Sequence, residues 1–291
     1  MNLRSRLAAT VVAVGAAVGV LLTVAVPGSL GAYTARITNS ANTVSTNPWF
    51  TCLGAAQGDT ASIVYEMDDT QSVAVPVVST TMADQSGNLR NGQYTTSGVA
   101  FRQTNGPCAR DGGFAVTLNG STGYSYGPNT TYNPSTFSEE IWFKTTTGGG
   151  KLMGFGNART GSSSQYDRHV YLTNAGNVVF GVYPGAIKTV QSTATYLDGR
   201  WHHVVATQAG ATNANPGIRL YVDGALVGSD STVVTNENAA EYWRIGYDNI
   251  NSWGVTQPTN FFFTGSLAFA SLYLTTALTP TQVRAHFNAG L

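Results

Sequence analysis

The sequence predicts an all-β fold, a sandwich or barrel of short antiparallel strands. Short runs rich in Val, Tyr, Phe and Thr alternate with Gly, Asn and Ser turns along most of the 291 residues. Hydrophobic residues make up 42% of the chain, which is enough to build a core. A tight hairpin pattern occupies Leu197–Ser229. This regular spacing of strands and turns favours a sandwich or barrel over βαβ units.

The N-terminal segment, residues 1–32, has the features of a signal peptide or a membrane anchor. Arg4 and Arg6 form a basic start, and Leu7–Val26 is apolar throughout. Small residues shortly after Pro27 fit a signal peptidase site, but the apolar run is also just long enough to span a bilayer. Either alternative predicts that the rest of the chain is secreted or at the cell surface.

Residues 33–60 are expected to form an N-terminal extension and residues 61–291 one domain, because no Pro-rich linker divides the chain after Cys52. Strand signals follow one another along this domain at regular spacing. The expected strands are 61–65, 114–118, 139–144, 151–156, 169–172, 178–183, 188–193, 203–208, 218–222, 225–229, 242–245 and 261–273.

Two local patterns specify their turns and caps most clearly. Asp223-Gly224 separates two strand signals, and both residue types tolerate the positive φ angles of a two-residue hairpin turn. Near the C-terminus, Thr279 is the expected N-cap of a short helix. Pro280 would take its first position, and Gln282 would complete a capping box.

The hairpin also carries a family resemblance. The patterns DGRWHHVV and LYVDGALV resemble the signature hairpin of laminin G-like domains, in the concanavalin A-like lectin/glucanase superfamily. Four further segments resemble that family in the same order, namely Asp84–Gly92, Gly113–Gly123, Phe137–Thr145 and Gly265–Ala285. The resemblance implies a jelly-roll β-sandwich of two antiparallel sheets, with carbohydrate or protein ligands.

The composition argues against one class of partner, and the cysteine count predicts a disulfide. A formal net charge of zero with only 10% charged residues argues against a nucleic-acid surface, which needs clustered Lys and Arg. Cys52 and Cys108 are the only cysteines, and an oxidising compartment outside the cytoplasm favours a disulfide between them.

Glu139-Glu140 is the only adjacent carboxylate pair in the expected strands. Neighbours on a strand point to opposite faces, so the two cannot act together on one bond. Retaining glycosidases need two carboxyl groups about 5–5.5 Å apart. The Glu-x-Asp-x-x-Glu pattern of laminarinase-type members of the superfamily is also absent. We therefore expect no enzyme, with one glutamate solvated and the other near a strand end, and a glycoside hydrolase is a disfavoured alternative.

The histidines give no metal pattern. His202 and His203 are adjacent on an expected strand and should diverge in the same way as the two glutamates. His169 and His286 have no partner at ligand spacing, and we expect them to be ordinary surface or packing residues.

The resemblance implies a candidate Ca²⁺ site, because laminin G-like domains often bind one Ca²⁺. Asp84 and Asn88 lie in the loop that matches the family's Asp-Ser-Gly-Asn turn and offer the oxygen ligands that Ca²⁺ prefers. However, Ala268 stands where the family's closing strand usually has Asp. The alternative is that Asp84 and Asn88 bond the backbone of their own turn.

The loop Tyr247–Phe261 carries the candidate ligand contacts. Sugar binding needs exposed aromatic platforms with a few polar groups, and Trp253 lies in a polar stretch outside any strand signal. Tyr247 and Asp248 are further candidates, and Trp49 and Tyr166 are weaker ones. The alternative for Trp253 is an anchor packed over the sheet edge.

Together these observations predict a non-catalytic extracellular binding domain for a polysaccharide or a surface glycoprotein. The alternative is a structural or adhesive cell-envelope protein without a small ligand. Contact with a membrane is expected only through residues 1–32, if they are not cleaved.

Overall fold

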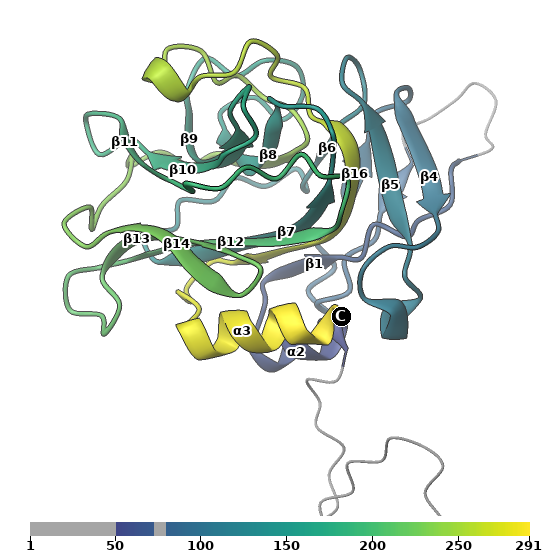
Figure 1. The fold of residues 1–291 in the computed structure, drawn as a ribbon, viewed down its shortest axis with the longest axis horizontal. Helices are drawn as coiled ribbons and strands as arrows, with labels where there is room; N and C mark the ends of the chain where they lie inside the picture. The colour runs from purple at the N-terminus through teal and green to yellow at the C-terminus, as the bar shows by residue number, and fades with distance from the viewer. Residues whose placement is uncertain (1–50, 73–79) are drawn as a thin grey trace, which may run out of the picture. The chain divides into compact units, whose positions relative to one another are not determined.

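The computed structural model describes residues 51–72 and 80–291, so the predicted signal or anchor segment lies outside the described residues. The described chain forms two antiparallel sheets packed face to face, which confirms the predicted β-sandwich (Figure 1). None of its helices has the length and apolar character needed to cross a membrane.

The first sheet, called sheet A, has the strand order β14-β13-β12-β7-β16-β5-β4, and β1 pairs with β16 outside this path. Its strands are β1 (Ile63–Tyr65), β4 (Val99–Gln103), β5 (Ala115–Asn119), β7 (Phe137–Lys144), β12 (His202–Ala209), β13 (Gly217–Val222), β14 (Ala225–Asp230) and β16 (Thr264–Tyr273).

The second sheet, called sheet B, has the order β11-β10-β9-β8-β15-β6-β3-β2. Its strands are β2 (Thr81–Met82), β3 (Gly92–Tyr94), β6 (Ser125–Tyr126), β8 (Lys151–Gly156), β9 (Tyr166–Leu172), β10 (Val178–Val182), β11 (Lys188–Gln191) and β15 (Tyr242–Ile245).

The main core fills the space between the sheets. Aromatic side chains from both sheets meet there, because alternate residues of each strand point inward. Phe137 of sheet A packs edge-on against Phe155 and Phe180 of sheet B, with ring centroids 6.3 and 6.2 Å apart. Tyr65 stacks on Trp243 across the same interior.

Two helices cover the outer face of sheet A (Figure 1). They are α2 (Cys52–Gly58) and α3 (Pro280–Ala289). Thr279 and Gln282 form both bonds of the predicted capping box at the start of α3. Phe287 of α3 stacks on Trp142 of the sheet.

The predicted disulfide and hairpin turn are both present. Cys52 and Cys108 are joined, with Cα atoms 5.8 Å apart, and the bond ties α2 to the short 3₁₀ helix η2 (Ala109–Asp111). Asp223 and Gly224 have φ angles of 52° and 74°, as a two-residue turn of the expected kind requires. The strands β2, β3, β4 and β6 and the helix α2 were not predicted from the sequence.

Candidate functional site

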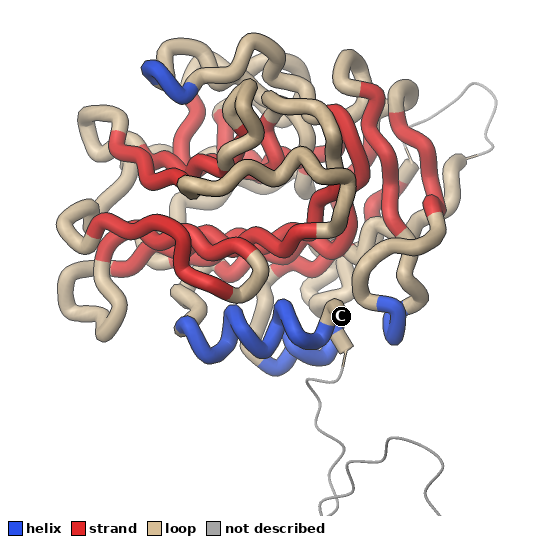
Figure 2. The backbone as a smooth tube through the Cα atoms, in the orientation of Figure 1, coloured by secondary structure: helices blue, strands red, loops and turns tan. Residues whose placement is uncertain are grey.

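Two loops cross the outer face of sheet B, and Figure 2 shows this layer of loop above the strands. They are the segment 157–165, between β8 and β9, and the segment 246–263, between β15 and β16, which contains the 3₁₀ helix η3 (Gly254–Thr256). The candidate site lies where these two loops meet the hairpin between β10 and β11.

Two glycines in the sheet allow close packing, Gly181 against Trp253 of the second loop and Gly154 against His169 of β9. A Cβ on Gly181 would come 2.4 Å from the Trp253 ring, and one on Gly154 would come 2.3 Å from the Cβ of His169. Trp253 therefore packs down onto β9, with its ring centroid 4.0 Å from that of His169. Only 4% of Trp253 is exposed. It anchors the loop, and one edge of its ring still borders a pocket.

Asp248 fastens the two loops to each other. Its carboxylate accepts hydrogen bonds from the backbone N–H and the hydroxyl of Ser163, both at 2.9 Å. The ammonium of Lys151 and the guanidinium of Arg244 each lie 3.6 Å from it. All three charged side chains are fully buried. This cluster holds the loops in place and leaves Asp248 no access to a ligand.

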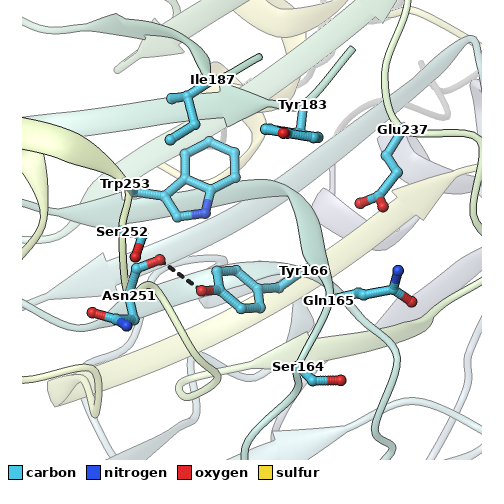
Figure 3. Close-up of a pocket in the computed structure, with 9 residues that line it drawn as sticks. All are labelled: Ser164, Gln165, Tyr166, Tyr183, Ile187, Glu237, Asn251, Ser252 and Trp253. Atoms are coloured by element: carbon cyan, nitrogen blue, oxygen red, sulfur yellow. Dashed lines mark hydrogen bonds between the residues drawn. The ribbon is translucent and has the colours of Figure 1, made fainter. Parts of the chain in front are cut away.

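The pocket beside Trp253 has a volume of about 220 Å³ (Figure 3). Aromatic rings form much of its wall, since Tyr166 and Tyr183 join Trp253 around the space. The Tyr166 hydroxyl donates to the carbonyl of Asn251 at 2.6 Å, which fixes that ring against the loop. The lining residues are Ser164, Gln165, Tyr166, Tyr183, Ile187, Glu237, Asn251, Ser252 and Trp253.

Several polar groups of the pocket have no partner within the described part of the chain. The Glu237 carboxylate, the Gln165 amide and the Trp253 indole N–H make no hydrogen bond there. Figure 3 shows the carboxylate of Glu237 and the nitrogen edge of Trp253 turned toward the open centre. Tyr183 is 40% exposed and Ile187 is 39% exposed, so the pocket opens to solvent on their side.

Asp167 fixes the backbone of two residues that line the pocket. One oxygen of its buried carboxylate accepts from the backbone N–H of Tyr183 at 2.6 Å, and the other accepts from the backbone N–H of Glu237 at 2.8 Å. Burial raises the pKa of Asp167, while the charge on Arg168 opposes that shift. Asp167 is a positioning residue, because it fixes the backbone of two lining residues without lining the pocket itself.

Glu237 is the only charged residue that lines the pocket. Partial burial and the neighbouring charge of Asp167 raise the pKa of Glu237. His169, behind Trp253, is fully buried, and burial with the nearby Lys151 charge keeps its pKa well below the usual range. His169 is therefore a neutral packing residue beneath the aromatic wall.

The predicted ligand residues are only partly brought together. Trp253 and Tyr166 line the pocket, whereas Tyr247 and Asp248 do not. Trp49 lies outside the described residues. Tyr247 stacks on Phe262 with ring centroids 3.6 Å apart and planes within 8°, outside the pocket. Sequence reasoning missed Tyr183, Gln165 and Glu237. The Tyr183-Pro184-Gly185 sequence is a turn signal that could have placed Tyr183 at a hairpin end, but Glu237 had no such signal.

The Asp84 loop is closed by its own hydrogen bonds. Asp84 accepts from the backbone N–H groups of Val64, Ser86 and Arg90 at 2.9–3.0 Å and from the Ser86 hydroxyl at 2.9 Å. Asn88 donates to the carbonyl of Ser62. Both carboxylate oxygens thus serve the turn, and Ca²⁺ binding at this loop stays a prediction.

Elsewhere among residues 51–72 and 80–291, one group has metal-ligand spacing. It consists of Cys52, Cys108 and Asp111. The disulfide joins both of its sulfurs, which removes them as thiolate ligands.

The adjacent carboxylates lie on opposite faces of β7, as predicted. Glu139 points into the sandwich and accepts from the indole N–H of Trp243 at 2.9 Å. Glu140 lies under α3 and pairs with His286 at 2.9 Å and with His203 at 2.8 Å. The expectation that one glutamate is solvated is wrong, since Glu139 is fully buried and Glu140 is 5% exposed. The helices α2 and α3 cover the outer face of sheet A, so Glu140 on that face is not exposed to water.

His286 is likewise more than a surface or packing residue. It is 2% exposed, and its second nitrogen bonds Asp59 at 3.0 Å. The sequence did not reveal this because Asp59, Glu140 and His286 are far apart in the chain. His202 and His203 diverge as predicted, with His202 bonded to Asp198 and Asp223.

Comparison with known proteins gives the class of this fold. Residues 119–284, more than half of the chain, match the family described as the concanavalin A-like lectin/glucanases superfamily. The chain therefore belongs to that superfamily, which confirms the resemblance to laminin G-like domains. No curated protein matches its sequence.

Solved structures show the same fold at low sequence identity. Domain 4 of AbnA, a GH43 extracellular arabinanase from Geobacillus stearothermophilus solved with arabinotriose, is 16% identical, with a TM-score of 0.54. The match covers 78% of this chain and 98% of that domain. A Trypanosoma rangeli sialidase, solved with 2,3-difluoro-KDN, is 11% identical with a TM-score of 0.52. That match covers 79% of this chain but only 32% of the sialidase.

Proposed function

We propose that this protein is a non-catalytic carbohydrate-binding domain and that its ligand occupies the pocket beside Trp253. The observation that carries the proposal is the combination of three aromatic side chains with unpartnered polar groups around one open space. Sugars present flat apolar C–H faces together with hydroxyl groups. Aromatic rings match the first, and a few fixed polar groups match the second.

The arrangement supports binding better than hydrolysis. Glycosidases of the usual kind need two carboxyl groups on either side of the scissile bond. Glu237 is the one carboxylate that lines this pocket. Glu139 and Glu140 are buried on the two faces of β7, in sheet A, and neither lines the pocket.

A second pocket, of about 250 Å³, is a weaker candidate for the ligand. It lies at the end of β7 and is lined by Lys144, four threonines and two glycines. No aromatic side chain lines it, so it offers no platform for a sugar ring.

The fold-level comparisons are consistent with this proposal. The arabinanase domain was solved in complex with arabinotriose, a neutral oligosaccharide, and it covers most of the present chain. We further propose a secreted or cell-surface protein whose partner is a polysaccharide or a surface glycoprotein. In this layout residues 1–32 are a signal peptide or anchor, 33–60 an extension, and 61–291 the laminin G-like domain.

Binding of the purified chain to an array of neutral pentose and hexose oligosaccharides tests the function, followed by calorimetry on the best ligand. Trp253→Ala and Tyr183→Ala should each weaken binding by about tenfold or more, since stacking side chains dominate such sites. Trp201→Ala is the matched control, because Trp201 is partly exposed but does not line the pocket. Equal binding by all three variants and the parent, or no binding to any glycan, would contradict the proposal.

A further inference from the structure

The charge of the pocket points to the class of sugar that it accepts. Among its nine lining residues there is one acid, Glu237, and there is no Lys, Arg or His. The buried cations of the sheet are already engaged. Arg168 donates to Glu241 at 2.8 Å, and Lys151 lies 3.6 Å from Asp248. Neither lines the pocket. Glu237 therefore carries the only charge on the pocket wall, and the nearby Arg168 charge favours its ionised form.

Aromatic rings border the same space as that carboxylate. Figure 3 shows Trp253, Tyr183 and Tyr166 around the space toward which the carboxylate of Glu237 points. Ring faces carry a negative quadrupole and attract cations, and a carboxylate beside them adds a direct ion pair. An ammonium group in this space would gain the ion pair with Glu237, whereas Trp253, which turns its nitrogen edge to the space, adds no attraction of the ring-face kind. A ligand carboxylate would meet a like charge in a partly desolvated site.

The backbone of Glu237 is also fixed before any ligand arrives. Its backbone N–H is held by Asp167, which is fully buried. Its side chain makes no hydrogen bond or ion pair with any described residue. A ligand cation would therefore not have to displace an existing partner of this carboxylate.

We propose that the pocket binds sugars carrying a protonated amine in preference to neutral sugars, and that it discriminates against sugars carrying a carboxylate. This inference rests on the proposed function and specifies the ligand class of the same site. Glu237 is the residue that determines the preference, while the three rings provide the affinity common to all sugars.

Three tetrasaccharides of matched ring size but different charge test the proposal by calorimetry at pH 6. They are a glucosamine tetramer, its N-acetylated counterpart and a galacturonate tetramer. We expect the glucosamine tetramer to bind about tenfold more tightly than the N-acetylated one, as an ammonium partly desolvated among aromatic rings would. The galacturonate tetramer should bind most weakly. If the N-acetylated or the galacturonate tetramer bound more tightly than the glucosamine tetramer, the proposal would be overturned.

Variants separate this charge preference from sugar binding itself. Glu237→Gln should reduce the difference between the aminated and acetylated tetramers to within about twofold, and Glu237→Lys should favour the galacturonate. Asp68→Asn, which removes an equal charge outside the pocket, should keep the preference. An unchanged preference in Glu237→Gln would sink the inference while leaving the proposed function standing. If no tetramer bound the parent and Trp253→Ala behaved in the same way, both the inference and the proposed function would be contradicted.

Discussion

Glu139 is a carboxyl group enclosed in the sandwich core. Its Oε2 accepts from the Trp243 indole, and its Oε1 has no hydrogen-bond partner in the structure. Burial raises the pKa of Glu139 to about 8, although Trp243, Lys151 and Arg168 each pull it down. The folded protein therefore keeps this side chain protonated and neutral at pH 7, whereas an unfolded chain would ionise it near its ordinary pKa of 4.5.

This difference should make stability depend on pH. Because the folded-state pKa is raised, the contribution of Glu139 is fully present below about pH 4.5 and is lost as the pH rises through about 8. Each pH unit in that window costs about 1.4 kcal/mol. Glu139→Gln should make the free energy of unfolding fall less steeply with pH. Relative to the parent, the variant should therefore become more stable between pH 5 and pH 8. Urea denaturation at pH 5, 6.5 and 8 measures both slopes, and parallel slopes would show that Glu139 is ionised in the fold.

The helix α3 is held on sheet A by a buried ion pair as well as by apolar contacts. His286 lies between Glu140 of β7 and Asp59 at the end of α2, and Glu140 also bonds His203 of β12 and Tyr273 of β16. Burial disfavours the charged imidazole, but the Glu140 charge and the Asp59 hydrogen bond together raise the pKa of His286 to about 10. Burial opposes ionisation of Glu140 as well, yet His286 and His203 hold its pKa well below the usual range.

Removing one member of this pair should loosen the helix. His286→Ala leaves Glu140 buried with one cation fewer, and breaking a buried pair typically costs about 3–5 kcal/mol. The raised pKa of His286 gives stability that is present below about pH 6.5 and lost as the pH rises through about 10. The lowered pKa of Glu140 gives stability that is present above about pH 4.5 and lost as the pH falls. The pair therefore contributes most between about pH 4.5 and 6.5.

Hydrogen exchange of the α3 backbone amides, together with urea denaturation at pH 6, measures this effect. Arg284→Ala on the exposed side of the same helix is the matched control and should change the free energy of unfolding by less than about 0.5 kcal/mol. Equal exchange rates in the two variants would mean that apolar packing alone holds α3 in place.

At the scale of the whole molecule, the disulfide joins α2 and η2 across a sequence separation of 56 residues. In the chain-entropy account, such a crosslink restricts the unfolded state and contributes about 4 kcal/mol. The double variant Cys52→Ala, Cys108→Ala should lose a comparable free energy of unfolding, with little change in glycan binding, because the bond does not line the pocket. Denaturation curves with and without reductant measure the loss, and coincident curves would contradict the prediction.

The parts of this fold that could be predicted are those with local chemistry. The Asp223-Gly224 turn, the Thr279 capping box and the long strands each follow from residues adjacent in sequence. The strands β2 and β6 were missed because each has only two residues, too few to show a period. Helix α2 was missed because its Gly- and Ala-rich sequence is held by tertiary packing and the disulfide rather than by a periodic pattern.

The candidate site was predictable only where one residue stood out. Trp253 drew attention as a large aromatic side chain in a polar loop, and the structure places it at the pocket. Asp248 looked similar in sequence but is buried beneath the loop by Ser163, which lies 85 residues earlier. The buried Asp167 bonds the backbone of both Tyr183 and Glu237, and no local pattern encodes this link between distant segments.

The placement of the two helices has a consequence for how the pocket is presented. Thr51, at the start of the described chain, and Leu291, at its end, adjoin α2 and α3 on the outer face of sheet A (Figure 1). The pocket opens on the outer face of sheet B, on the far side of the sandwich. The two ends of the described chain and the pocket therefore lie on opposite faces of the sandwich. If the pocket binds a sugar as proposed, a polymer would reach it from the side of sheet B, without contact with α2 or α3.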